Sequence, residues 1–208
     1  MKLYFHKFLY SITKNKAVLT NTSLLVKYLR KKMTLSLQNF NRALSEAEQL
    51  LACFEALNNH PELCSYDVLK KASLIMTLTA WETYVEDVVT EIFDVKFSLI
   101  KGSQFGHFAE KQLHERLKFF HNPNSNKTKK LFEEFFGVDI TEQWKWPNVL
   151  PKDAREQLNK WISKRGEAVH RAQLDTTQPQ IIKKDELEKC LRFFKALAQA
   201  TDKALAVI

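Results

Sequence analysis

Eight apolar residues between positions 74 and 99 recur at spacings that alternate four and three without interruption. This alternation is typical of a helix that packs like a coiled coil, and it predicts one long helix over about residues 67 to 100. The eight residues are Leu74, Leu78, Trp81, Val85, Val88, Ile92, Val95 and Leu99. Residues off this seam predict a second contact face, namely Met76, Thr79, Thr83, Tyr84 and Val89. A helix with such wide apolar coverage lies at the centre of a bundle or against another subunit.

Five further segments are also predicted to be helical. They cover about residues 35–58, 106–121, 128–136, 151–171 and 183–206. Gly137 closes one of them, since glycine takes a left-handed cap with little strain, and Pro151 suits the first turn of another. The aromatic segment with Trp144 and Trp146 is expected to pack down between these two helices. With no convincing strand pair, we predict an all-α fold, an up-and-down bundle of about four to six helices with one long central helix.

Charge is distributed unevenly along the chain. Of the 32 Lys and Arg residues, eight lie in residues 1–32, which hold no Asp or Glu; the remainder carries 24 basic against 24 acidic residues. The folded part is therefore neutral, so affinity for RNA would have to come from a local cluster. Because Met33 opens the first well-patterned helix, we predict a helical domain over residues 33–208 and a non-native or flexible basic extension before it. The alternative is a basic arm that binds RNA or a membrane surface.

Several function classes are disfavoured by residue usage. The four glycines fit neither the phosphate-binding loop nor the dinucleotide fingerprint. No apolar run reaches the ~18 residues of a membrane span. Three widely spaced cysteines are typical of reduced thiols in the cytoplasm, which is the expected location. His107, His114 and His121 lie seven residues apart, or about 10 Å between neighbours on a helix. They cannot share one metal ion, and we expect neither a metal nor a cofactor.

One charged side chain lies on an apolar helix stripe near the end of the 151–171 segment. Arg165 falls where Leu158, Ile162 and Val169 recur at spacings of four, three and four. Its guanidinium therefore points toward a core, cleft or partner, where it either pairs with a carboxylate or awaits an anion. His170 can exchange a proton near neutral pH. A fixed cation with a proton carrier is what phosphodiester cleavage needs.

Helical geometry restricts how Arg165 and His170 could cooperate. Positions five apart lie about 140° from each other on a regular helix, so the two cannot meet over one site. Either the helix ends between them, loosened by Gly166, or a two-fold dimer joins two copies into a composite cleft. A purely structural alternative is that Arg165 forms an ion pair with Glu82 or Glu86 and fixes helix packing.

The segment from Arg165 to His170 resembles the Arg-x4-6-His signature of the HEPN superfamily, small all-helical domains of which many are metal-independent ribonucleases. Residues 80–86, and residues 136–140 with the tryptophans that follow, are similar to the RNA-ligase-associated RiboL-PSP branch. The resemblance covers roughly residues 33–208. Gly166 departs from the polar residue that many members carry after the arginine. Ala172 stands where one subgroup has a modified tyrosine, which argues against that form of regulation.

The resemblance implies a homodimeric, metal-independent endoribonuclease that leaves 2′,3′-cyclic phosphate and 5′-hydroxyl ends. Arg165 would hold the scissile phosphate, and His170 would act as general base or general acid. Such domains commonly serve as toxins or defence effectors, so the expected partners are RNA, a second copy and a neutralising antitoxin. The alternative is a catalytically inactive helical module that binds RNA or a protein.

Further residues are candidates for supporting this site. Basic side chains next to the signature could contact RNA phosphates at its rim, and acidic side chains could position the arginine or the histidine. The basic candidates are Lys164 and Arg171, and the acidic ones are Glu82, Glu86 and Glu167.

Overall fold

A computed structural model describes residues 33–58, 66–170 and 181–205. Their regular structure is entirely helical, which confirms the all-α prediction. The α-helices are α3 Leu35–Asn58, α4 Asp67–Lys96, α5 Gln104–Lys118, α6 Ser125–Phe136, α7 Pro151–His170 and α8 Lys184–Leu205. Two short 3-10 helices are η1 Ser98–Ile100 and η2 Ile140–Gln143. The predicted basic extension over residues 1–32 lies outside the described residues.

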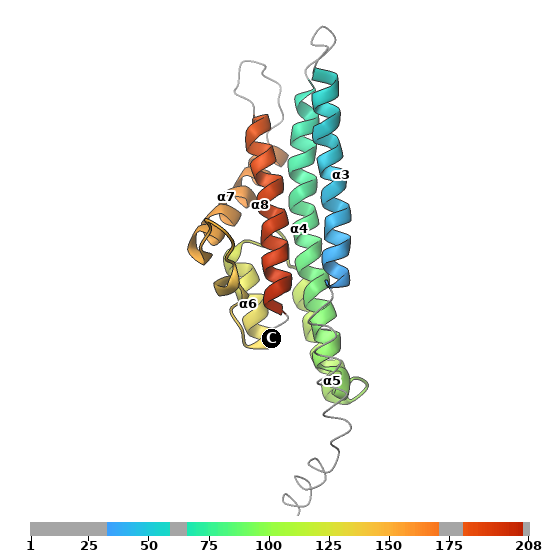
Figure 1. Cartoon of the computed structure of the whole chain (residues 1–208). Coiled ribbons are helices and arrows are strands. Elements are labelled where there is room, and N and C mark those ends of the chain that lie inside the picture. Colours follow the sequence, from blue (N-terminus) through green and yellow to red (C-terminus); the bar gives the residue numbers. More distant parts are fainter. Residues whose placement is uncertain (1–32, 59–65, 171–180, 206–208) are drawn as a thin grey trace, which may run out of the picture.

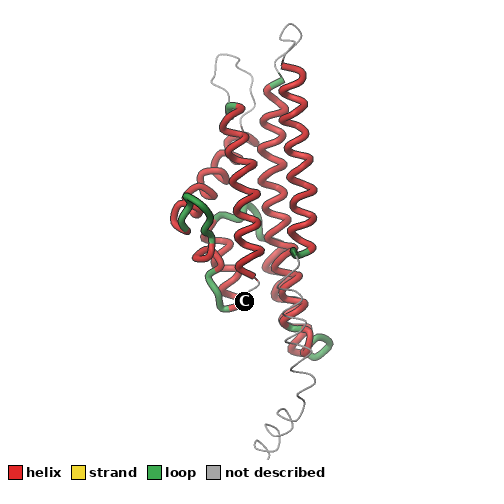
Figure 2. The backbone as a smooth tube through the Cα atoms, in the orientation of Figure 1, coloured by secondary structure: helices red, strands yellow, loops and turns green. Residues whose placement is uncertain are grey.

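The helix α4 is the centre of the bundle, as its sequence predicts. It runs antiparallel to α3, and α8 lies beside both (Figure 1). The helices α6 and α7 also pack against α4, and η2 connects them to α8. Beyond this bundle, α4 continues into η1 and α5, and loops join the helices (Figure 2). Among the described helices, none is apolar enough over a sufficient length to cross a membrane.

The core is built from the predicted seam of α4 and from aromatic residues that carry a polar atom. Trp81, Tyr84 and Trp144 are almost completely buried. The Tyr84 hydroxyl donates to the Ala198 carbonyl at 3.1 Å, and Trp144 Nε1 donates to Thr201 Oγ1 at 2.9 Å. These hydrogen bonds satisfy groups that would otherwise destabilise the interior. The prediction that the segment with Trp144 packs down is confirmed.

The long helix α4 ends at Lys96 rather than near residue 100, and the predicted seam, which continues into η1, is not buried to its end. Val95 is 43% exposed and Leu99 is 90% exposed, although both continue the predicted repeat. The reason is the position of α3, whose first residues are hydrogen-bonded to Glu91. Because α3 begins level with Glu91, the last turn of α4 projects past it.

Local capping explains the bounds of α6. The Asn124 side chain accepts a hydrogen bond from the backbone N–H of Lys127 at 2.9 Å, so the helix begins at Ser125, three residues before the predicted start. At its other end, Gly137 adopts φ 69° and closes the helix, as predicted.

The N-terminus of α3 is capped by side chains from position 34, from α4 and from α8. Thr34 Oγ1 accepts from the N–H of Leu37 at 3.0 Å. The Glu91 carboxylate accepts from the N–H groups of Leu35 and Ser36 at 3.2 and 3.0 Å. Asp202 of α8 accepts from Thr34. The donors that a helix start leaves free are therefore satisfied from position 34 onward.

We therefore expect a chain that begins at Met33 to unfold within about 2 °C of the full chain, because its first helix keeps its caps. Glu91→Gln in the full chain should lower the melting temperature by about 2–4 °C, as a lost charged cap costs about 1 kcal/mol. Circular dichroism melting measures both. A large loss of stability in the shortened chain would show that residues 1–32 belong to the folded unit.

Candidate active site around Arg165

Arg165 lies on the buried stripe of α7, which differs slightly from the predicted one. The buried residues of α7 are Ala154, Leu158, Trp161 and Ala168. Arg165 continues their spacing of four, three, four and three, and its side chain is 20% exposed. Two other stripe predictions were wrong in degree: Ile162 is half-buried and Val169 is 51% exposed. The side of α7 that carries Trp161 and Ala168 is therefore covered more fully than the side that carries Ile162 and Val169.

Arg165 contacts α4 through an ion pair. Its Nη1 lies 3.3 Å from Glu82 Oε2, and the Glu82 side chain is 17% exposed. The same nitrogen also donates to Asn122 Oδ1 in the turn between α5 and α6. Arg165 Nε is buried and has no hydrogen-bond partner among the described residues. The carboxylate pairing considered from the sequence is therefore present, with Glu82 as the partner, and one guanidinium donor stays unsatisfied.

Glu82 joins the turn at residues 121–124 to α7. Its Oε2 accepts from the backbone N–H of Asn122 at 3.2 Å, while His121 Nδ1 lies 3.5 Å from its Oε1. The preceding residue on α4, Trp81, donates from Nε1 to the Pro123 carbonyl at 3.1 Å in the core. Asn122 itself has φ 52°, a left-handed conformation that asparagine tolerates better than most residues. Two consecutive residues of α4, Trp81 and Glu82, therefore hold this turn through hydrogen bonds.

His121 was not among the predicted site residues, since sequence reasoning considered it only as a metal ligand and rejected that role. The structure places it across the Glu82 carboxylate from Arg165, although 44 positions separate the two in the chain. No local pattern could place this turn against α4. The one available signal was the turn composition after a histidine, His121-Asn122-Pro123-Asn124.

His170 does not join this cluster within one chain. The helix α7 continues through Gly166 to His170, which is exposed at its last residue. The idea that the helix ends between the two signature residues was therefore wrong, because Gly166 fits a regular helix. On that helix Arg165 and His170 project about 140° apart. A site that uses both must take one of them from another copy.

The remaining candidates have separate environments. Lys164 forms an ion pair with Glu186 of α8 and is 18% exposed, so it contributes to packing between α7 and α8. Glu167 is exposed, and Glu86 is half-buried. Burial raises the pKa of Glu86, and the neighbouring Glu82 carboxylate raises it further. Arg171 lies outside the described residues.

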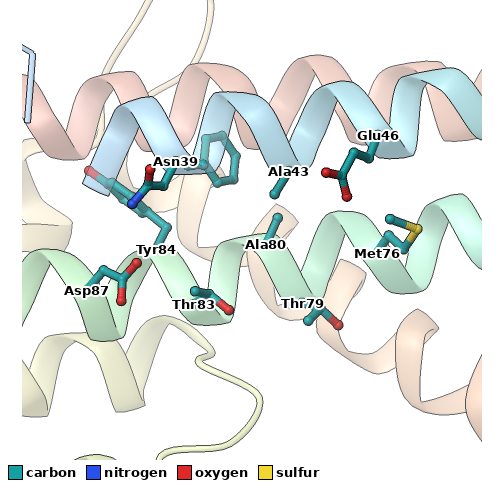
Figure 3. Close-up of a pocket in the computed structure, with 10 residues that line it drawn as sticks. Asn39, Ala43, Glu46, Met76, Thr79, Ala80, Thr83, Tyr84 and Asp87 are labelled. Atoms are coloured by element: carbon teal, nitrogen blue, oxygen red, sulfur yellow. The ribbon is translucent and has the colours of Figure 1, made fainter. Parts of the chain in front are cut away.

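A groove of about 240 Å³ lies elsewhere, between α3 and α4. Figure 3 shows Ala43 and Ala80 facing each other across it, with polar side chains at both ends. Of the predicted second face of α4, four residues line this groove, namely Met76, Thr79, Thr83 and Tyr84, whereas Val89 is buried in the core. The groove contains no residue of α7 and is therefore not the site of Arg165. Within the described part of the chain, no three His, Cys, Asp or Glu residues are placed to hold a metal ion.

These features define an all-α domain with a long central helix and an Arg-x4-His helix packed against it. The chain belongs to the RiboL-PSP-HEPN family, whose model matches residues 39–207. Membership in a HEPN family associates the chain with RNA-related function. Comparisons with curated proteins and with solved structures give no match.

The raised pKa of Glu86 predicts a pH-dependent stability. The folded chain retains this proton to a higher pH than the unfolded chain, so stability falls as pH rises from about 4.3 through the folded pKa. Glu86→Gln should therefore raise the melting temperature by about 1–2 °C at pH 7.5 and leave it unchanged near pH 4. Glu115→Gln on the exposed side of α5 is the control. A variant that melts at or below the wild-type temperature at pH 7.5 would contradict this interpretation of Glu86.

Proposed function

We propose that this protein is a metal-independent endoribonuclease of the HEPN type, with a composite site at a homodimer interface. Arg165 of one copy and His170 of the other form its core. The observation that carries the proposal is the state of Arg165, a half-buried cation in the family signature whose Nε has no partner among the described residues. A buried donor without a partner costs about 1–3 kcal/mol, and a phosphate oxygen would remove that cost.

The chemistry follows from the two side chains. Arg165 uses Nη1 for Glu82 and Asn122, so its Nε and Nη2 edge is the one suited to two parallel hydrogen bonds to a phosphate. Attack of the ribose 2′-oxygen on phosphorus places more negative charge on the phosphoryl oxygens, which the guanidinium stabilises. Departure of the 5′-oxygen leaves a 2′,3′-cyclic phosphate and a 5′-hydroxyl. His170 of the second copy exchanges a proton with one of the reacting oxygens.

A two-fold dimer would bring these groups together through a single kind of contact between copies. The straight α7 directs Arg165 toward α4 and leaves His170 exposed at its end, next to the half-exposed apolar Val169. An isologous contact uses the same patch on both copies, so it creates two equal sites at once. Lys164 and Arg171 remain candidates for rim contacts to RNA, Lys164 only after it leaves Glu186.

The biological role that fits such an enzyme is that of a toxin or defence effector in the cytoplasm, restrained by an antitoxin or another neutralising protein. The alternative is a catalytically inactive module that binds RNA or a protein. One observation favours it: Glu82 and Asn122 of the same chain already contact Nη1 of Arg165. Activity measurements separate the two proposals.

In the presence of EDTA, wild-type protein should cleave RNA and leave cyclic phosphate ends, whereas Arg165→Ala and His170→Ala should each lose about 10²-fold or more in rate. Arg155→Ala is the matched control, because Arg155 also lies on α7 and also pairs with a glutamate, Glu142. The control should retain wild-type rates. Wild-type protein that binds RNA but does not cleave it, with an intact fold, would favour the inactive module.

Composite sites predict rescue between two inactive variants. A mixed dimer of Arg165→Ala and His170→Ala chains has one site that lost both residues and one site that retains both. Since about half of randomly formed dimers are mixed, co-expression should restore about a quarter of wild-type activity. Light scattering checks that the mixed species is a dimer. An absence of rescue in confirmed mixed dimers would place both residues in a single-chain site and overturn the composite arrangement.

A further inference from the structure

The Glu82 carboxylate holds a basic side chain on each of its two oxygens. Arg165 Nη1 lies 3.3 Å from Oε2, and His121 Nδ1 lies 3.5 Å from Oε1. Glu82 is mostly covered, whereas the His121 side chain is 68% exposed. Because the two ring nitrogens lie on opposite sides of the imidazole, Nε2 of His121 is directed away from Glu82. A titratable nitrogen is therefore available beside the arginine of the signature.

The position of His121 is fixed by its neighbours even though its ring is exposed. Phe120 before it is buried, and Pro123 after it is buried and accepts the hydrogen bond of Trp81. The carbonyl of His121 itself accepts from Lys127 Nζ of α6. A backbone held at three points in four residues keeps the imidazole close to Glu82. Precise placement of this kind is what proton transfer requires.

We propose that His121 is a second proton-transferring residue of the Arg165 site, contributed by the same chain as Arg165, and that its substrate is the RNA 2′-hydroxyl. This inference rests on the proposed ribonuclease function. It differs from an arrangement in which two copies of His170 perform both proton transfers. Each composite site would then contain Arg165, Glu82 and His121 from one chain and His170 from the other.

Glu82 determines which role His121 takes. The Glu82 carboxylate, 3.5 Å from Nδ1, favours the tautomer that carries its proton on Nδ1. In that tautomer Nε2 carries a lone pair, which is the form of a general base. His121 Nε2 takes the proton of the 2′-hydroxyl as the O2′–P bond forms. The P–O5′ bond breaks, and protonated His170 of the other copy gives its proton to O5′. One proton is taken and one is given, so the step balances without a further reactant.

The charged groups that surround His121 come from three helices. Glu82 and Glu86 face it from α4, Arg165 from α7, and Lys127 from α6. With one histidine as base and another as acid, the rate should depend on pH as a bell with two ionisations.

The first test is His121→Gln with His114→Gln as the matched control, since His114 is an exposed histidine on the neighbouring α5. Glutamine keeps a polar N–H group near Glu82, and the backbone contacts of residue 121 do not depend on its side chain. The expected result is a fall in kcat/KM of about 10²-fold for His121→Gln and loss of one ionisation from its pH profile. The control should keep both the rate and the bell. Melting curves of the variants ensure that rates are compared at equal folded fractions.

The second test asks which chain supplies His121, with two mixed dimers that each carry His121→Gln in one chain only. In the first dimer, His121→Gln is placed on the chain with Arg165→Ala; in the second, on the chain with His170→Ala. If His121 works beside Arg165 of its own chain, the first dimer retains an intact site and the second has none. The second should be about 10²-fold less active than the first. A folding defect caused by His121→Gln would affect both dimers equally.

The outcomes distinguish the role of His121 from the ribonuclease function itself. Equal activity of the two mixed dimers, or a His121→Gln enzyme that keeps the rate and both ionisations of the wild type, overturns the role of His121 and leaves the ribonuclease proposal standing. Absence of RNA cleavage by the wild-type protein overturns both.

Discussion

The hydrogen bond from Trp81 Nε1 to the Pro123 carbonyl ties the turn between α5 and α6 to the middle of the longest helix. It is buried, so breaking it would leave two polar groups unsatisfied in the core. The next residue, Glu82, then meets the backbone of Asn122 and the side chains of Arg165 and His121. Consecutive residues of α4 therefore have different roles: Trp81 packs in the core, and Glu82 contacts the residues of the candidate site. The residues around Arg165 are therefore connected directly to the core through α4.

The ion pair between Glu82 and Arg165 is mostly covered, so each charge depends on the other for compensation. Removing one partner of a covered ion pair leaves an uncompensated charge, so each residue is needed for the other. The pair is also incomplete, because Nε of Arg165 lacks a partner among the described residues. The edge with Nε is covered in the free chain, so an anion can reach it only with side-chain movement. Arg165 is therefore held near Glu82 in the free chain, and contact of its Nε with an anion requires the covering side chains to move.

Much of the fold was predictable because helical periodicity is a local property. The bounds of α3 and the central position of α4 followed from apolar spacing, and Gly137 closed α6 as its conformational freedom predicted. The predictions were wrong where the exposure of a residue depends on how other helices pack against it. Val95 and Leu99 are exposed because α3 begins level with Glu91, which no repeat in α4 could reveal. The stripe of α7 was assigned to Ile162 and Val169, but contact with α4 favours Trp161 and Ala168.

The candidate site was only half accessible to sequence reasoning. Glu82 and Glu86 were named as possible partners of Arg165 because a charge on an apolar helix stripe is unfavourable unless it is paired. His121 was not found, since its place depends on how a turn closes onto α4. His170 was predicted from its spacing to Arg165, and that prediction stays untested; spacing alone left open whether the helix ends at Gly166. The turn is set by long-range packing, which local patterns do not encode.

The continuity of α7 has a consequence for how the proposed enzyme would be controlled. A helix without a break directs Arg165 and His170 to different sides. If the proposed roles hold, a lone copy brings the base and the cation to one phosphate but not the acid. On the proposed arrangement, association of two copies completes both sites together. Activity would then rise with the square of protein concentration well below the dimer dissociation constant. A neutralising partner could therefore inhibit the enzyme by covering the end of α7, without entering the site around Arg165.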